Sequence, residues 1–564
     1  MLETMLDYIR VALYIALIVI GFFLFQAWDK EHPKLDLPLP TQAEPLATTG
    51  HFTPEVSRQA TPVSIPSPVD ATHNTVPASA VTKGELVTVK TDVLEVSIDT
   101  RGGDIVETKL LKYPESLNAK TPFVLFNDND KTRYIAESGL LSTEGPDTTQ
   151  AQALYTATQK NYSLNPNQNE IAVPLTWQNK DGVRVTKMFH FAKGSYEIKV
   201  DYAIANQSTQ PWQGQLYTQL MRTNVPPPSN SGMISLATYF GAALSTPQKP
   251  FTKISFKEMH EKSFNQTVEG GWAAMIQHYF ISAWVPPAKI VSHYYAKALQ
   301  NGLYLIGMIS DPMHVTPGQS LSLETKLYAG PAIADQLERT APGLKLTIDY
   351  GWFWFISGVI FWMMQKIYEV VGNWGWSIVL VTIIIKLFFY HLSAKSYRSM
   401  SMLKKLQPRV EALKERYGDD KQKMTQATLE LYRQEKVNPM SGCLPILIQI
   451  PVFIALYWVL VESVQMRQAP FILWIHDLSQ HDPYYVLPIL MGISMFIQQR
   501  LNPPPADPMQ AKVMMLMPII FTVLFANFPA GLMLYWFVNN TLSFLQQWYI
   551  MNKLDKGTNN RKTS

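Results

Sequence analysis

The chain has 564 residues, 47% of them hydrophobic, and a formal net charge of only +4. This near-neutral charge argues against a dedicated nucleic-acid-binding protein. The single cysteine, Cys443, excludes an intramolecular disulfide and a cysteine-based metal cluster. The apolar residues are concentrated in long uncharged blocks near the two ends, whereas the middle resembles a water-soluble domain. This distribution predicts a multi-domain membrane protein.

The first 30 residues contain an uncharged run, Val11–Trp28, close to the roughly 20 residues that cross a bilayer as a helix. The end of this run, FLFQAWDK, lacks the small residues of a cleavage site. We therefore expect residues 1–30 to be an uncleaved signal anchor, with a cleaved signal peptide as the alternative. Residues 31–84 are rich in Pro, Ser and Thr and lack apolar periodicity, which predicts a flexible tether.

Residues 85–341 change to a period of two. Apolar and polar side chains alternate along Tyr196–Ile204, the pattern of a strand with one buried face. Turn signals such as Arg101–Asp104 and Asn179–Gly182 separate the runs. About 250 residues of this kind predict a large all-β sandwich.

Membrane-like blocks return after Pro342. Tyr350–Trp362 is apolar and aromatic, and Trp374–Leu392 is mostly apolar and contains Lys386 as its only charged residue. Further apolar blocks follow at Leu444–Val461, Tyr484–Ile497 and Val513–Met551. The last block is about twice the hydrocarbon thickness as a helix, so we expect it to fold back at Asn527–Gly531.

Positive charge is densest between Lys395 and Lys436, and the positive-inside rule places this segment in the cytoplasm. If the N-terminal anchor spans, only one further crossing can precede this segment, so Tyr350–Trp362 is predicted to lie on the outer interface. Residues 342–372 are then an interfacial amphipathic helix, 373–394 the second span, 395–440 a cytoplasmic hairpin, 441–551 spans three to six, and 552–564 a basic cytoplasmic tail. Six spans, cytoplasmic termini and a periplasmic β-domain in a bacterial inner membrane follow from this count.

The basic segment carries an apolar stripe at three-four spacing, formed by Leu403, Leu406, Val410, Leu413 and Tyr417. The letters YGDD then supply a helix stop and a new N-cap. We expect an antiparallel helical hairpin. Its charges either only fix the topology or bind a partner such as ribosomal RNA or a targeting factor, and the pattern selects neither.

Four segments together resemble the YidC/Oxa family of membrane protein insertases: LQPRVEALKERYGDDKQKM, LYRQEKVNPMSGCLPILIQIPVFIALYWVL, RQAPFILWIHDLSQHDPYYVLPILMG and FPAGLMLYWFVNN. The resemblance is dense over about residues 349–553, and the layout before it is similar to the Gram-negative form. It implies spans two to six around a hydrophilic groove that opens to the cytoplasm and to lipid. It also implies a β-supersandwich for residues 85–341, a fold shared with sugar mutarotases without importing their catalysis.

In this family a positive side chain lies in the groove, and its position is matched here by Lys386, where the best-known members carry arginine. The other groove positions that the resemblance implies are Thr382, Gln449, Tyr535, Asn539 and Asn540. The hairpin residues that the resemblance offers for ribosome or targeting contacts are Arg409, Lys414, Arg416, Asp419 and Asp420. A lysine keeps the charge but loses the planar fork of arginine.

Lys386 lies within an apolar block, and no Asp or Glu falls inside any other predicted span. A lysine near the centre of a membrane helix costs about 2.5 to 3.5 kcal/mol unless water or a partner is available. A hydrated groove is the favoured explanation, with partial snorkelling and local bilayer thinning as the alternative.

We therefore predict an insertase and chaperone that acts on nascent membrane proteins in the bilayer, alone or with the Sec translocon, with ribosome and targeting machinery as possible partners. A secondary transporter that uses Lys386 as its ion or substrate site is the alternative. An enzyme is not expected, since G-x-S-x-G, H-E-x-x-H and the nucleotide-binding P-loop are missing. No cofactor or metal is expected. Two His-Asp pairs, His476–Asp477 and His481–Asp482, are expected to be solvated surface charge.

Overall fold

The structure, a computed structural model, describes residues 84–560 apart from 130, 149–150, 227–237, 288, 300–301, 419, 438–443 and 503–507. The predicted signal anchor, nearly all of the predicted tether, Asp419 and Cys443 lie outside the described residues. The described residues form a β-domain followed by a helical region.

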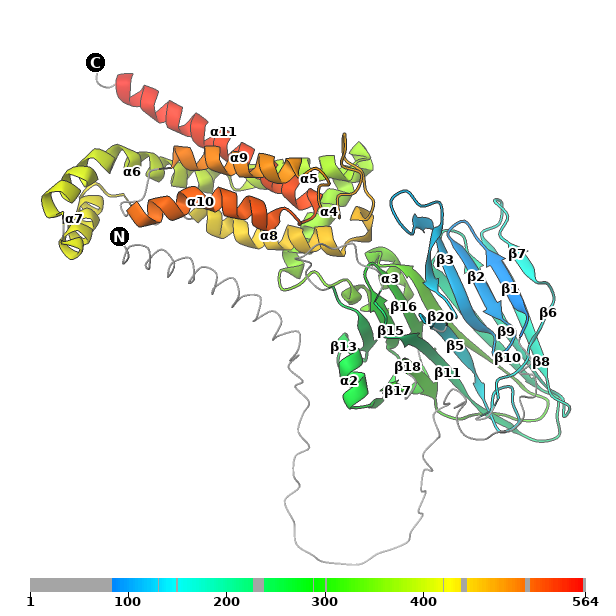
Figure 1. The fold of residues 1–564 in the computed structure, drawn as a ribbon. Coiled ribbons are helices and arrows are strands. Elements are labelled where there is room, and N and C mark those ends of the chain that lie inside the picture. Colours follow the sequence, from blue (N-terminus) through cyan, green and yellow to red (C-terminus); the bar gives the residue numbers. More distant parts are fainter. Residues whose placement is uncertain are drawn as a thin grey trace, which may run out of the picture. The chain divides into compact units, whose positions relative to one another are not determined.

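Two sheets build the β-domain (Figure 1), and within the described residues they contain 11 and 9 strands. The strands of the larger sheet are β1 (Leu86–Lys90), β2 (Leu94–Asp99), β3 (Asp104–Pro114), β4 (Pro122–Phe126), β5 (Tyr134–Leu141), β7 (Asn161–Ser163), β11 (Trp212–Thr223), β14 (Phe264–Glu269), β17 (Val291–Ala298), β18 (Leu303–Ser310) and β19 (Met313–Val315). The strands of the smaller sheet are β6 (Thr156–Ala157), β8 (Glu170–Gln178), β9 (Val183–Ala192), β10 (Glu197–Asn206), β12 (Gly241–Ser245), β13 (Thr252–Ile254), β15 (Trp272–Gln277), β16 (Phe280–Val285) and β20 (Ser320–Pro331). The predicted all-β domain is confirmed.

The order of the larger sheet is β14-β17-β18-β11-β5-β3-β2-β1-β7, with β19 beside β11 and β4 beside β3. The order of the smaller sheet is β13-β12-β15-β16-β20-β10-β9-β8-β6. Strand β10 shows why the sheets pack face to face, because Ile198, Val200, Tyr202 and Ile204 are all 0% exposed and alternate with more exposed residues. The alternation predicted for this strand is confirmed, and a large hydrophobic core joins both sheets.

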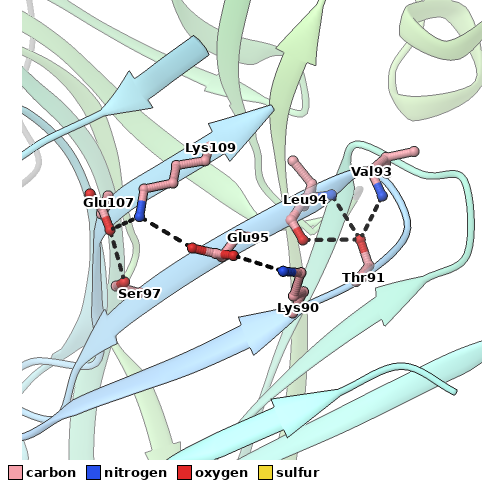
Figure 2. A network of polar contacts seen from close by, with 8 residues as sticks. All are labelled: Lys90, Thr91, Val93, Leu94, Glu95, Ser97, Glu107 and Lys109. Atoms are coloured by element: carbon pink, nitrogen blue, oxygen red, sulfur yellow. Dashed lines mark hydrogen bonds and ion pairs between the residues drawn. The ribbon is translucent and has the colours of Figure 1, made fainter. Parts of the chain in front are cut away.

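The solvent side of β1, β2 and β3 carries a charge ladder that Figure 2 shows. The carboxylate of Glu95 lies 3.4 Å from the Lys90 ammonium on one side and 3.2 Å from the Lys109 ammonium on the other. The Lys109 ammonium also forms an ion pair with the Glu107 carboxylate at 3.0 Å, and Glu107 accepts a hydrogen bond from Ser97. The register explains the ladder, because Glu95 is directly opposite Lys90 on β1 and Lys109 on β3.

The β-domain contains the short helices α2 and α3, and longer helices form the helical region. The helices are α2 (Phe256–Glu261), α3 (Ala334–Thr340), α4 (Trp354–Val371), α5 (Trp374–Phe388), α6 (Tyr390–Tyr417), α7 (Lys421–Gln434), α8 (Leu444–Glu462), α9 (Val486–Leu501), α10 (Pro508–Phe525) and α11 (Ala530–Asn560), with 3-10 turns η1 (Leu344–Thr347) and η3 (Val464–Met466). The predicted turn at Asn527–Gly531 is confirmed, since it separates α10 from α11.

The helical region packs around α11, which contacts α5, α6 and α9, while α4 packs on α5 and α8. Helix α4 buries Ile360 and Met364 and exposes Trp354, Val359 and Trp362, so the predicted amphipathic helix is present. Among the residues that the structure describes, no single helix is both long and apolar enough to cross a bilayer, whereas α5 and α6 meet these criteria together as a pair bent by 67°.

The expectation of solvated charge in the loop after α8 is wrong for Asp482, which is 0% exposed. Its carboxylate accepts hydrogen bonds from the Trp474 indole at 2.9 Å and from the backbone N–H groups of Tyr484 and Leu487. Buried carboxylates need such donors, and here they fix the approach to α9. The backbone of Leu478 and Gln480 in the same loop accepts hydrogen bonds from the first turn of α11, so this loop packs over the start of that helix.

Candidate functional site

Lys386 lies in the last turn of α5, just before the bend at Phe389. The predicted second span, residues 373–394, is thus divided by this bend between α5 and α6. No proline or glycine lies at the bend, so these two common sequence signals of a helix kink are missing there. A cation in a last turn is favourable because the helix end has a partial negative charge.

The half-buried ammonium of Lys386 points to side chains of two other helices. It donates a hydrogen bond to the Ser543 hydroxyl of α11 at 2.6 Å and a long one to the Gln449 amide oxygen of α8 at 3.5 Å. Within the described part of the chain the ammonium forms no ion pair, and no charged side chain perturbs it. The charge is therefore held by neutral acceptors.

Tyr535 and Asn539 complete this group of residues. The Tyr535 hydroxyl lies within hydrogen-bonding reach of Gln449, and Tyr535 is buried. The Asn539 carbonyl accepts a hydrogen bond from Ser543 at 2.7 Å. We call the set Lys386, Gln449, Tyr535, Asn539 and Ser543 the Lys386 cluster. It joins α5, α8 and α11 by polar contacts between otherwise apolar helices.

Two of the predicted groove residues are directed elsewhere. The Thr382 hydroxyl is buried and donates to the Ile378 carbonyl of its own helix at 2.6 Å, so its proton is already used. The Asn540 amide donates to the Ser494 hydroxyl of α9 at 3.2 Å. The structure therefore brings together Lys386, Gln449, Tyr535 and Asn539, whereas the side-chain hydrogen bonds of Thr382 and Asn540 go to other residues.

The sequence prediction missed Ser543, the nearest partner of Lys386, although a signal was present. Tyr535, Asn539, Ser543 and Gln547 recur at every fourth position of an apolar helix, and each is less than 10% exposed. This spacing places polar groups on one face of α11. Beyond Ser543, the Gln547 amide contacts Gln498 at 2.8 Å and Asn502 at 3.0 Å, so the polar face continues toward the end of α9.

The predicted hairpin is formed by α6 and α7. Arg409 pairs with Glu435 at 2.5 Å across the hairpin, and Asp420 caps α7 by accepting a hydrogen bond from the Lys423 backbone at 3.1 Å. That hydrogen bond, together with the Lys423 side chain, lowers the pKa of Asp420. Lys414 and Arg416 are exposed, and Asp419 lies outside the described residues. Arg409 and Asp420 thus have structural partners inside the hairpin.

A second buried lysine lies between the two sheets of the β-domain. Lys187 of β9 is 0% exposed, and its ammonium donates to the carbonyls of Gly102, Gly103 and Ser138 at 3.0, 2.8 and 2.6 Å. Gly102 and Gly103 have positive φ values of 72° and 68°, and a side chain on Gly103 would collide with the lysine stem. The predicted turn at Arg101–Asp104 therefore also supplies hydrogen-bond acceptors for the Lys187 ammonium.

Three buried carboxylates surround Lys187: Asp104, Glu137 and Asp147. Burial raises the pKa of Glu137 and of Asp147 to about 6, and burial with the Glu137 charge raises the pKa of Asp104. Burial also lowers the pKa of Lys187 to about 8, against the attraction of these carboxylates. We call these four residues with Ser138 the Lys187 cluster. A lysine at an inward position of the alternating strand β9 was the signal for it in the sequence.

Comparison with known proteins identifies the relatives of this chain. The family model described as the YidC periplasmic domain matches residues 86–363, and the model described as the 60Kd inner membrane protein matches residues 366–557. A Legionella pneumophila protein named Membrane protein insertase YidC is 50% identical over 97% of this chain and 97% of its own length. The chain belongs to the YidC family.

Two further matches are to a curated protein and to a solved structure. A Nitrosococcus oceani protein of the same name is 46% identical over 97% of this chain and 99% of its own length. A solved structure described as an active YidC insertase with its first transmembrane domain resolved is 19% identical, with a TM-score of 0.38, and covers 83% of this chain and 95% of that one. The identities to the Legionella and Nitrosococcus proteins confirm the family resemblance that the sequence segments indicated.

Proposed function

We propose that this chain is a membrane protein insertase, which transfers hydrophobic segments of nascent membrane proteins into the bilayer and assists their folding. The observation that carries this proposal is the 50% identity, over 97% of the chain, to a relative named Membrane protein insertase YidC. The secondary-transporter alternative gains no support from the relatives described above, because their names describe insertases.

The proposed location is a bacterial inner membrane, with the β-domain in the periplasm, six spans and both termini in the cytoplasm. The descriptions of the two matching family models, a periplasmic domain and an inner membrane protein, support this location. The dense positive charge of α6 and α7 supports a cytoplasmic hairpin. The exposed tryptophans of α4 support its proposed place on the outer interface.

In the proposed mechanism, the polar flank of an incoming segment enters a hydrated groove at the Lys386 cluster. Lys386 attracts acidic residues of that flank, while Gln449 and Tyr535 offer polar contacts that lower the cost of dehydrating it. The apolar part then moves into lipid, favoured by roughly 25 cal/mol per Å² of apolar surface removed from water. The packing of the loop after α8 over the start of α11 supports closure of the groove on the outer side.

The orientation of Lys386 supports a groove rather than snorkelling. A snorkelling lysine extends its ammonium along the helix toward water, but here the ammonium contacts α8 and α11. The neutral character of both partners leaves the charge available for an acidic residue of a substrate. A point charge on a flexible stem is sufficient for this attraction, so the bidentate fork of arginine is not required.

The cytoplasmic hairpin is the proposed contact for ribosome or targeting machinery, and the Sec translocon is a proposed partner in the membrane. Lys414 and Arg416 are the hairpin residues best suited to a partner, because both are exposed. Arg409 would first have to break its contact with Glu435. No cofactor or metal is required by this mechanism.

Reconstitution of the full chain in liposomes tests the function. A small membrane protein with an acidic periplasmic flank is translated in the presence of these vesicles, and protease protection of the flank is measured. We expect protection with the wild-type chain, little protection with empty liposomes, and reduced protection with Lys386→Glu. Equal protection in vesicles with and without the chain would contradict an insertase function.

A further inference from the structure

The contact between Ser543 and Lys386 has a defined direction. The Ser543 hydroxyl donates its only proton to the Asn539 carbonyl at 2.7 Å, one turn earlier in α11. Its oxygen is therefore the acceptor for the Lys386 ammonium, which lies 2.6 Å away. The proton of this hydroxyl is thus directed to Asn539 and its oxygen to Lys386, which fixes its orientation.

The lysine, in contrast, keeps free capacity. An ammonium has three donors, and only Ser543 and the distant Gln449 occupy them within the described residues. A carboxylate in place of Ser543 would neutralise the charge and compete with any acidic ligand. A hydroxyl orients the ammonium without neutralising it, and a ligand carboxylate forms a stronger, charge-assisted bond than a hydroxyl does.

We propose that Ser543 is a positioning residue that holds the Lys386 ammonium toward α11 by a neutral hydrogen bond, which an acidic substrate flank displaces. This role rests on the proposed insertase function. It also explains how a lysine can serve at this position, because its four-carbon stem has many rotamers whereas the rigid guanidinium of arginine is preorganised. Ser543 supplies the orientation that the lysine itself lacks.

The test uses the full chain in liposomes and two substrates that differ only in their flank, with Asp and Glu in one and Asn and Gln in the other. Ser543→Asp places an internal carboxylate beside Lys386. We expect it to lower insertion of the acidic substrate about tenfold relative to the neutral one, because the internal ion pair must first be broken. Ser543→Ala removes the acceptor, and we expect it to lower insertion of the acidic substrate about threefold.

Ser377→Ala is the matched control. Ser377 is also buried in the bundle, and its hydroxyl donates to the carbonyl four residues earlier, that of Asn373, but it does not contact Lys386. We expect this control to leave the ratio of acidic to neutral insertion unchanged. In a Lys386→Arg background, Ser543→Ala should have a smaller effect than in the lysine background, because arginine orients its own donors.

Insertion of the neutral substrate reports whether each variant is folded. If Ser543→Asp inserts neither substrate, the ratio measured for Ser543→Ala decides the question. Equal loss for both substrates in Ser543→Ala, or an unchanged ratio in a folded Ser543→Asp, would overturn the positioning role while leaving the insertase function intact. Failure of the wild-type chain to insert either substrate would instead contradict the proposed function and the positioning role that rests on it.

Discussion

Lys187 and Lys386 are two lysines removed from bulk water in different parts of one chain, and they are satisfied in different ways. Lys187 is fully buried and donates to three fixed backbone carbonyls. Lys386 is half-buried and has one short and one long contact, both to neutral side chains. All three donors of the first are used, so it stabilises the fold, whereas the second keeps capacity for a ligand. Satisfaction of the donors, rather than burial alone, separates a structural charge from a functional one.

The largest effect is expected for Lys187→Met, which keeps most of the side-chain volume but removes the ammonium. Three buried carbonyls would lose their donor, and three buried carboxylates would lose their nearest cation. We expect the free energy of unfolding of the β-domain to fall by about 3 kcal/mol or more. Hydrogen exchange of β5 and β9 in the full chain measures this loss.

Lys193→Met is the matched control, because the exposed Lys193 also donates to a carbonyl, that of Pro166 at 2.9 Å. We expect its effect to stay within about 0.5 kcal/mol. Equal exchange in the Lys187 and Lys193 variants would show that the buried lysine is not structural.

The second effect is a pH dependence of the β-domain. Because burial raises the pKa of Glu137 and Asp147 to about 6, the folded state holds more protons than the unfolded state between their ordinary values and pH 6. Their stabilising contribution is present at lower pH and is lost as the pH rises through about 6. We expect this contribution to fall by on the order of 2 kcal/mol for each of the two groups between about pH 4 and 7.

The pH effect is measured by hydrogen exchange in wild type and in Glu137→Gln, whose amide does not titrate. The slope of stability against pH should be shallower in Glu137→Gln, while the exposed Glu261→Gln should keep the wild-type slope. Stability that rises equally with pH in all three chains would contradict the assignment of a raised pKa to Glu137.

The third effect concerns the charge of Lys386. Lys386→Glu should lower insertion of a substrate with an acidic flank by about tenfold or more, because attraction becomes repulsion, and leave β-domain stability unchanged. Lys386→Arg should retain insertion, since it keeps the charge. Protease protection in liposomes measures both variants, and a neutral-flank substrate serves as the control. Insertion by Lys386→Glu at the level of Lys386→Arg would exclude an electrostatic role.

The smallest effect is expected for the surface ladder of Figure 2. Burial alone would raise the pKa of Glu95, but contacts with Lys109 and Lys90 outweigh it and lower that pKa. Glu95→Gln should nevertheless cost less than about 1 kcal/mol, because exposed ion pairs are screened and hold flexible side chains. Thermal unfolding at low salt and at about 1 M salt measures the cost, which should shrink at high salt. A cost as large as that of Lys187→Met would contradict the ranking.

Much of the architecture could be predicted because it depends on local periodicity. The alternation along β10 and the turn at Gly102–Gly103 are visible in short windows of sequence, as are the apolar stripe of α6 and the turn before α11. The amphipathic helix α4 was instead predicted from the count of membrane crossings, because only one further crossing could precede the basic segment.

The remaining features depend on contacts between distant residues. Lys187 and Gly102 are 85 residues apart in the sequence, and Lys386 and Ser543 are 157 residues apart. Neither contact can therefore be predicted from a short window of sequence. The bend at Phe389 contains no proline or glycine that would predict it from the sequence. The burial of Asp482 depends on the fold of its loop, and the family resemblance located Lys386 without its partner.

Photo-crosslinking from Gln449 tests most directly whether the Lys386 cluster receives substrate. A photoreactive amino acid is placed at Gln449 in the full chain, a small membrane protein is translated in its presence, and adducts are identified by mass. The exposed Val370 of α4 serves as the control position. We expect adducts between Gln449 and the nascent transmembrane segment that are absent from Val370. Labelling of soluble ligands alone, or equal labelling from both positions, would contradict the proposed groove.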